Sequence, residues 1–411
     1  MTASRRVVVT GLGQVSALGL DVPAFAEAVF AGRSGIARLA GFSAPGIDDP
    51  IAAAIPGFDP ALCLSTRALP TAPRAAQYAV AAAMQAVASA GLGGAERERG
   101  CVFVGTGFGG IAEIEETYRA CFAEAGLRPR PTAIPTAMAN AAAGLLASEL
   151  RFKGENLTFA TACSSATHAI GHAFRRIRAG EVDVALAGGA DAPLTPVVLA
   201  AWGSMRVLAP AGADPARACR PFDRTRQGIV VGEGAGFLVL EAADHVSARG
   251  GRALAEVAGY GANADAGHVT RPDVEGVKDC IRRALHDAGV AMDAVGYVNA
   301  HGTGTPANDA TEARAIADVF ADRAKDLPVS STKAVHGHVM GAAGGLETIA
   351  TVLALRDGRI PPTAHLEEVD PALPDLDYVA GAPRSARVEC ALKNSFAFGG
   401  NNAVLVLRQI R

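Results

Sequence analysis

Residues 157–166 read LTFATACSSA, and this stretch decides the expected fold. A short apolar run ends in small residues, and an Ala-rich amphipathic stretch, Ser164–Ala179, follows at once. A strand that leads into a covering helix is the repeating unit of α/β proteins, so we predict helices packed on a mostly parallel sheet. Cys163 would then lie at the strand-to-helix junction, at the N-terminus of the helix.

The same alternation extends through the chain in both directions. Strands are expected near Arg6–Thr10, Cys101–Gly105, Leu157–Ala160, Val184–Ala187 and Gly236–Glu241, and again near Ala253–Gly259, Ala294–Ala300, Val329–Ser331, Ala391–Phe396 and Asn402–Leu407. Helices are expected over Arg74–Ala90, Ser164–Ala179, Gly276–Ala288, Asp309–Ala321 and Gly344–Arg356. The first strand is expected to end in a glycine turn at Gly11–Gly13.

The two series of strands follow a similar order, and each half ends in an apolar strand, FLVLE or VLVLR. This indicates an internal duplication, with a first half at 1–250 and a second at 251–411. The break falls near Asp244–Arg252, where the composition becomes charged and Gly-rich. The alternative is that any α/β protein looks repetitive at this level.

Composition excludes several classes of protein. The chain has 411 residues, 50% hydrophobic and 19% charged, and a formal net charge of -3, without the basic stripe of a nucleic-acid binder. The sequence has no apolar run of about 20 residues, so no membrane span is predicted. The N-terminal apolar run is too short for a signal peptide. Seven scattered cysteines without a CxxC pair indicate reduced thiols in the cytoplasm.

Cys163 differs from the other cysteines because it is flanked by small residues at a helix N-terminus. The helix dipole and the free N–H groups there favour a thiolate and can stabilise an oxyanion. A thiolate is the form that attacks a thioester. The alternative is a buried cysteine that fills a gap between helix and sheet.

Two further turns carry histidine at the ends of predicted strands. Residues 298–306 read VNAHGTGTP and contain His301, and residues 331–345 read STKAVHGHVMGAAGG and contain His336 and His338. Strand carboxyl ends form the usual site crevice in α/β proteins, and histidine can donate to a developing enolate near neutral pH. Either histidine could instead be a structural residue.

A metal site is not expected. His168 and His172 are spaced i, i+4 on the helix after Cys163, as zinc ligands can be, but the run is HAIGH, without the glutamate of a metalloprotease helix or a third ligand nearby in sequence. We interpret both as structural residues of a buried helix.

In its motifs the chain resembles the β-ketoacyl-(acyl carrier protein) synthases of the first and second types, in the thiolase-like superfamily. The resemblance rests on RRVVVTGLG, GTGFGG, TACSS, ALAGGAD, RPFDRTRQGIVVGEGAG, NAHGTGTPAND, STKAVHGHVMGAAG and NSFAFGGNN, in this order. It implies a duplicated α-β-α-β-α five-layer sandwich, normally a homodimer.

The resemblance also implies roles for individual residues. Cys163 would accept the acyl group, and His301 and His338 would bind the malonyl thioester carbonyl and promote decarboxylation. Lys333 would support the pair electrostatically together with Glu312. The backbone N–H groups of Cys163 and Phe398 would form the oxyanion hole, with Phe398 as a gate. The remaining roles are binding ones, assigned to Thr303, Thr305 and Phe108. The two threonines would contact the phosphopantetheine arm, and no metal or redox cofactor would be required.

Some positions depart from the family pattern. His336 stands where many relatives have Thr, which is typical either of a specialised synthase, such as one for polyene chains, or of a plain polar substitution. Phe108 is bulkier than the usual aliphatic residue at the acyl-pocket mouth, so it would shorten the pocket, select rigid chains, or only repack the dimer interface. Asn401 replaces the usual Thr. Candidates for carrier docking are Arg67, Arg74, Arg128, Arg130 and Arg206.

The resemblance therefore implies an acyltransferase that condenses an acyl thioester with malonyl-carrier in fatty-acid or polyketide chain elongation. A pathway-specific subunit that works with a chain-length-factor partner is the main rival, so the dimer could be a homodimer or a heterodimer. A non-catalytic partner subunit would usually lack the nucleophile. A thiolase would need a second cysteine in the SFAFGGNN loop, which has none, and third-type synthases have Asn where His338 stands.

Overall fold

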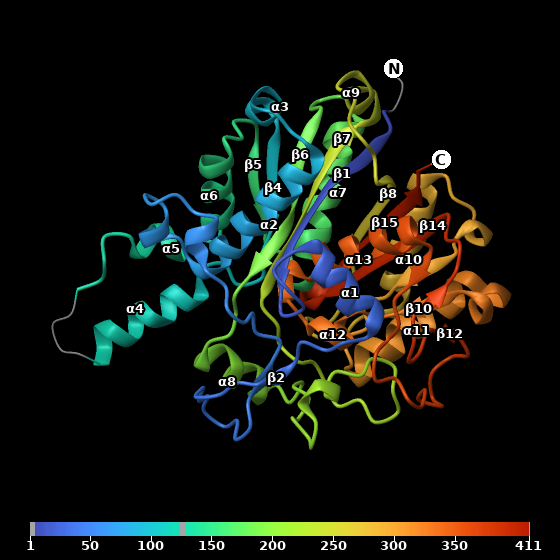
Figure 1. Cartoon of the computed structure of the whole chain (residues 1–411). Helices are drawn as coiled ribbons and strands as arrows, with labels where there is room; N and C mark the ends of the chain where they lie inside the picture. The colour runs from blue at the N-terminus through green and yellow to red at the C-terminus, as the bar shows by residue number, and fades with distance from the viewer. Residues whose placement is uncertain (1–4, 124–127, 411) are drawn as a thin grey trace.

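The computed structural model describes residues 5–123 and 128–410. Its central element is one long sheet, in which Figure 1 shows the strands of the first half in blue to yellow-green and those of the second half in yellow to red. Along the sheet the strands are β12 (Asp377–Tyr378), β10 (Pro328–Ser330), β9 (Tyr297–Asn299), β14 (Cys390–Ala397), β15 (Asn401–Gln409), β8 (Ala255–Ala264), β1 (Val7–Ser16), β7 (Gly234–Ala242), β6 (Val184–Asp191), β4 (Cys101–Gly105) and β5 (Asn156–Phe159). Two short ribbons accompany it, β2 (Ala37–Arg38) with β3 (Ile51–Ala52) and β11 (Arg359–Ile360) with β13 (Arg384–Ser385).

The strand order is the same in the two halves of the sheet. The first half runs β5-β4-β6-β7-β1 and the second runs β10-β9-β14-β15-β8, with β12 added at the edge. If the five strands of each half are counted in chain order, both halves have the order third, second, fourth, fifth, first. The halves join where β1 pairs antiparallel with β8 over three residues, Val7 to Val9. The structure thus repeats one topology, while the residue bounds of the two halves stay a prediction.

The expectation of a mostly parallel sheet is wrong. Pairs β4–β5, β4–β6, β9–β14, β9–β10 and β10–β12 are parallel, but β1–β7, β1–β8, β6–β7, β8–β15 and β14–β15 are antiparallel. Only Phe398–Gly400 separates β14 from β15. A connection this short allows only a hairpin, because a parallel pair needs a crossover of a dozen or more residues.

Helices form three layers around the two half-sheets. On the outer side of the first half lie α2 (Arg74–Ala90) and α6 (Ala141–Leu150), and on the outer side of the second lie α10 (Val274–Ala288) and α11 (Pro306–Phe320). Between the half-sheets lie α7 (Ser165–Arg178) and α13 (Ala343–Asp357). Residues Ala343–Leu355 of α13 are all buried, so this helix has no solvent-exposed face over that span. The arrangement is the thiolase-like five-layer sandwich (Figure 1).

Smaller helices complete the structure. They are α1 (Val22–Ala31), α3 (Gly94–Arg99), α4 (Ile111–Ala123), α5 (Ala133–Ala137), α8 (Pro196–Ser204), α9 (Ala243–Ala248) and α12 (Lys333–His336), and Figure 1 shows α4 and α5 extending from the body. Across the described ranges, no helix combines the length and the apolar character that a bilayer crossing needs.

Strand β1 continues to Ser16 instead of ending in the expected glycine turn. A Cβ at Gly13 would lie 1.8 Å from the carbonyl oxygen of Ala82 in α2. The glycines of this run therefore let an outer helix approach the strand closely, and they do not mark a turn. A glycine in a strand can mark either a turn or the close approach of a helix, and the sequence alone did not distinguish the two.

Candidate active site

Cys163 lies at the junction predicted from the sequence, in a short 3₁₀ turn, Ala162–Ser164, between β5 and α7. The preceding Ala162 has a φ of +50°, a left-handed conformation that a residue with a side chain seldom adopts. The two serines that follow stabilise this turn: Ser165 Oγ accepts the Thr161 N–H at 2.9 Å, and Ser164 Oγ donates to the Thr161 carbonyl at 2.9 Å. These hydrogen bonds explain why two serines follow the cysteine in the TACSS motif.

The two histidines come from the second half of the chain and face each other. The centroids of the His301 and His338 rings are 5.5 Å apart, with the ring planes at 83°. His301 directly follows the β9 residues and Ala300, and its backbone N–H donates to Glu312 Oε1 at 2.8 Å. The His338 backbone N–H donates to the Val230 carbonyl at 2.7 Å, which ties the second histidine to the first half of the chain.

Hydrogen bonds fix the tautomer of both imidazoles. Lys333 Nζ lies 3.2 Å from His301 Nδ1, and an ammonium can only donate, so this ring nitrogen is the acceptor. The Met340 N–H donates to His338 Nδ1 at 3.2 Å. In each neutral ring the proton is therefore on Nε2. Burial, with the nearby charge of Lys333, holds the pKa of both histidines well below its usual value, so both are neutral at physiological pH.

The carboxylate that pairs with Lys333 is Glu347 of α13. Glu347 Oε1 forms an ion pair with Lys333 Nζ, which also donates to the His301 carbonyl at 2.6 Å. Glu312 instead accepts the backbone N–H groups of His301 and Gly302, each at 2.8 Å, and forms no ion pair with Lys333 within the described ranges. The expectation that Glu312 assists Lys333 is thus wrong, because Glu347 is the acid that pairs with Lys333. Glu312 instead orders the backbone of the loop that carries His301.

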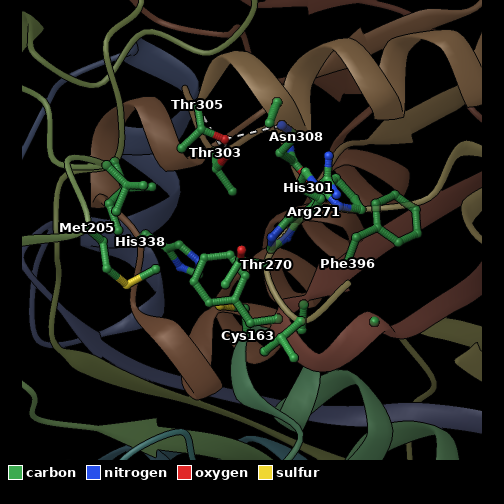
Figure 2. Close-up of a pocket in the computed structure, with 18 of the residues that line it drawn as sticks. Cys163, Met205, Thr270, Arg271, His301, Thr303, Thr305, Asn308, His338 and Phe396 are labelled. Atoms are coloured by element: carbon green, nitrogen blue, oxygen red, sulfur yellow. Dashed lines mark hydrogen bonds between the residues drawn. The ribbon is translucent and has the colours of Figure 1, made fainter. Parts of the chain in front are cut away.

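A cavity of about 210 Å³ opens beside these residues. Cys163, His301 and His338 all line it, and Figure 2 shows Thr303 and Thr305 on the side opposite Cys163, with the two histidines between. The hydroxyls of the two threonines are 2.8 Å apart. Residues from both halves of the chain therefore share one cavity, as the sequence predicted for this set.

Phe398 also lines the cavity, at the hairpin between β14 and β15. Its ring packs against Trp202, with the centroids 5.9 Å apart. Gly399 and Gly400 follow it with φ values of +82° and +69°, a backbone course that favours glycine and explains the FGG sequence. The oxyanion-hole role of the Cys163 and Phe398 N–H groups stays a prediction.

The expectation that Cys163 rests as a thiolate is not supported. Burial raises the pKa of the Cys163 thiol to about 12, against the opposing influence of the Lys333 charge. The side chain is nearly enclosed, and desolvation disfavours the charged thiolate. The structure therefore favours the neutral thiol as the resting form.

Other expected residues lie outside the cavity. Phe108 packs against the apolar cluster that contains Cys163 and Met340 but does not line the cavity. His336 is fully buried, with Nε2 2.9 Å from Thr332 Oγ1 and Nδ1 2.7 Å from the Gly337 carbonyl. His168 Nδ1 is 2.6 Å from the Tyr260 hydroxyl, so its pairing is structural.

Two buried acids at the site were missed from the sequence. Besides Glu347, Asp191 accepts from Thr106 Oγ1 at 2.7 Å and from the Gly107 and Gly341 N–H groups at 2.8 and 2.6 Å, which connects two turns around the cysteine. The available signal was an acid within an otherwise small or apolar run, ALAGGAD or GGLETIA. Such an acid needs a buried partner.

A duplicated five-layer sandwich with a cysteine facing two imidazoles defines the class of condensing acyltransferases. The chain belongs to the β-ketoacyl synthase family: residues 4–245 match the model of the β-ketoacyl synthase N-terminal domain and residues 254–367 that of the C-terminal domain. It is 42% identical over 410 residues to the 3-oxoacyl-[acyl-carrier-protein] synthase 2 of Coxiella burnetii, covering 99% of each chain.

Two further relatives carry other names. The chain is 43% identical over 408 residues to nodulation protein E of Rhizobium sp. strain N33, covering 99% of this chain and 100% of that one. A solved structure described as the ishigamide ketosynthase/chain length factor superposes with a TM-score of 0.94 at 41% identity, covering 100% of both chains. The chain is thus a condensing enzyme whose relatives carry the names of a 3-oxoacyl-[acyl-carrier-protein] synthase, a nodulation protein and a ketosynthase.

Proposed function

We propose that the chain catalyses decarboxylative Claisen condensation between an acyl group on Cys163 and malonyl-carrier. One observation carries the proposal: Cys163, His301 and His338 line one cavity, and both Nδ1 atoms are occupied by donors. Each ring then has an Nε2–H available for a substrate oxygen. Two such donors on one developing enolate oxygen are the electrostatic stabilisation that this reaction needs.

In the first half-reaction the Cys163 sulfur attacks the acyl thioester and the carrier thiol departs. The Cys163–acyl bond forms and the acyl–carrier bond breaks, and the proton from Cys163 ends on the carrier thiol. Because both Nε2 atoms already carry protons, the imidazoles serve as donors in this step and not as resting bases. The N–H groups of Cys163 and Phe398 would stabilise the tetrahedral oxyanion.

In the second half-reaction malonyl-carrier enters and its C–COO⁻ bond breaks, which releases CO₂ and leaves an enolate. His301 and His338 donate to the enolate oxygen while its carbon attacks the Cys163 thioester. The products are 3-oxoacyl-carrier, CO₂ and Cys163, which takes up one proton. The balance needs no redox partner, and we propose that the enzyme uses no cofactor beyond the phosphopantetheine of the carrier.

The phosphopantetheine arm of the substrate would run from the cavity mouth to the two threonines, Thr303 and Thr305. Arg271 lines that mouth, is exposed, and makes no ion pair within the ranges the structure describes. A free guanidinium suits the phosphate of phosphopantetheine, because arginine binds phosphate through paired N–H donors.

Changing Arg271 to glutamine is expected to raise KM for malonyl-phosphopantetheine by about tenfold, the value of one charged hydrogen bond, and to leave kcat unchanged. Malonyl-pantetheine, which lacks the phosphate, serves as the control substrate and should be unaffected. Steady-state decarboxylation with both substrates provides the measurement. An equal loss with both would show that Arg271 does not contact the phosphate.

Phe108 is proposed to limit the acyl chain, since it packs against the apolar cluster that contains Cys163 and Met340. Changing Phe108 to alanine should open space next to the sulfur and let Cys163 accept acyl chains several carbons longer. Acylation rates with a saturated C4–C14 carrier series give the readout. An unchanged chain-length preference in a folded variant would assign Phe108 to packing alone.

The acyl carrier protein is the proposed partner, as the name of the Coxiella relative states for that protein. The similarity to the solved ishigamide ketosynthase/chain length factor favours a second candidate function. By this reading the chain is a pathway-specific ketosynthase subunit that pairs with a chain-length-factor subunit. We propose a cytoplasmic location, which fits seven unpaired cysteines.

The proposal is tested by incubating the protein with a panel of saturated and polyunsaturated acyl-carriers and reading intact masses. We expect a covalent acyl adduct with at least one chain, and a preference for unsaturated chains under the pathway-specific alternative. Protein that never acylates, even with a candidate partner subunit added, would contradict the enzymatic assignment.

A further inference from the structure

Lys393 is a fully buried lysine whose side chain enters the middle layer of the sandwich. It lies in β14, paired with Asn299 of β9 on one side and with Leu405 of β15 on the other. Its Nζ donates to Thr167 Oγ1 of α7 at 2.9 Å and to Ser395 Oγ, and it forms an ion pair with Glu347 Oε2 at 2.9 Å. Neither of the two proposed half-reactions uses this ammonium.

Glu347 lies between two ammonium groups, one at each carboxylate oxygen. Oε1 pairs with Lys333 and Oε2 pairs with Lys393. The side chains of both lysines are 0% exposed and that of Glu347 is 1% exposed. Two cations share one directly paired anion, so the triad carries an excess positive charge out of contact with water. Burial of such a charge destabilises the fold through desolvation, and a functional role would explain why the charge is present.

The excess charge lies next to the decarboxylation site. Lys333 contacts His301 directly, and both Lys333 and Lys393 act electrostatically on His301 and His338. Burial lowers the pKa of Lys393 to about 8, so it is an ammonium at neutral pH. A cation behind an imidazole disfavours the imidazolium and favours an anion at the opposite nitrogen.

We propose that Lys393 is a positioning residue for decarboxylation: its ion pair with Glu347 Oε2 directs Oε1 to Lys333, which keeps Lys333 on His301 Nδ1, and its charge adds to the burial and the Lys333 charge that keep both imidazoles neutral donors. This inference rests on the proposed function. Lys393 does not touch the cavity, so it acts through Glu347 and Lys333.

The other charged and titratable groups around the triad do not cancel this effect. His336 of α12 is buried beside Glu347, and burial lowers its pKa to about 4, so it is neutral. Glu312 of α11 faces Lys393 electrostatically, but it is engaged by the His301 and Gly302 N–H groups and pairs with neither lysine within the described ranges. Loss of Lys393 therefore removes a cation that nothing replaces.

The test changes Lys393 to methionine, which has a similar length and no charge, and measures malonyl decarboxylation against pH. Removing a cation raises the pKa of the neutral imidazoles, so the fall in rate on acidification should begin at higher pH. If the acid limb moves by one unit, the rate below it drops about tenfold. Thr167 Oγ1 and Ser395 Oγ lie 2.9 Å apart and can pair with each other in the variant. Changing the exposed Lys325 to methionine controls for loss of one positive charge.

A second variant separates charge from packing. Lys393→Met combined with Glu347→Gln removes one cation and one anion. Lys333 then again gives the triad one excess positive charge, as in the wild type, so the acid limb should return toward its wild-type position. Lys393→Arg, which keeps the charge, should retain the wild-type limb and serves where the methionine variant does not fold. A folded Lys393→Met protein whose pH profile overlaps that of the wild type, or a double variant displaced as far as the single one, overturns the inference. Wild-type protein without decarboxylation at any pH overturns the proposed function instead.

Discussion

Replacing Cys163 with alanine is expected to abolish the acyl adduct and all 3-oxoacyl product while malonyl decarboxylation persists. The sulfur of Cys163 is the one thiol among the described residues that line the cavity, but the two Nε2–H donors come from the other half of the molecule and do not depend on it. Intact-mass measurement follows acylation, and CO₂ release from malonyl-carrier follows decarboxylation. Cys219→Ala is the matched control, since Cys219 is buried outside the cavity.

Two outcomes would contradict this separation of roles. An acyl adduct that survives in Cys163→Ala would place the nucleophile elsewhere. Loss of decarboxylation together with acylation, in a variant that unfolds at the wild-type temperature, would show that the sulfur is itself required for CO₂ release and that the histidines do not suffice.

Replacing His338 with alanine should lower the decarboxylation rate by about 10²-fold or more, the typical effect of removing one oxyanion donor. Replacing His336 should leave the rate per folded molecule nearly intact, because that ring lies outside the cavity. Its loss instead strands the Thr332 hydroxyl and the Gly337 carbonyl, so stability should fall by about 1–3 kcal/mol. The measurements are CO₂ release and thermal unfolding on both variants.

The pair forms its own control, because the two histidines lie two positions apart in sequence and differ in geometry. If decarboxylation persists without His338 and collapses without His336, the assignment is reversed. If both variants lose the rate equally while folded, the backbone turn that joins them, and not one imidazole, would be the working element.

Much of the fold was predictable from the sequence because β-branched runs and Ala-rich helices alternate strongly. The expected helix Arg74–Ala90 matches α2, and the repeated strand order reflects the two similar series of motifs. The antiparallel pairs were missed because strand direction depends on connections, and the FGG hairpin between β14 and β15 looks in sequence like any glycine turn. The long β1 was missed because glycines that admit α2 look the same as glycines that turn a chain.

Of the site, the positions of Cys163 and His301 were predictable, since each follows a strand end, and His338 was found from its motif although the helix α12 separates it from β10. The charge state of Cys163 was not predictable, because burial depends on packing that no local motif records. The Lys333–Glu347–Lys393 triad was not predictable either. Its members come from α12, α13 and β14, and a lysine in an apolar strand shows no partner until the middle layer is assembled.

The most direct test of the account is a single turnover on protein already acylated at Cys163. Malonyl-carrier is added, and CO₂ release and the intact mass of the protein are followed together. If the sulfur and the two imidazoles share one cavity, each CO₂ released should remove one acyl group from Cys163 and yield one 3-oxoacyl-carrier. Release of CO₂ while the acyl group stays on Cys163 would show that the enolate forms out of reach of the thioester, and the account would fail.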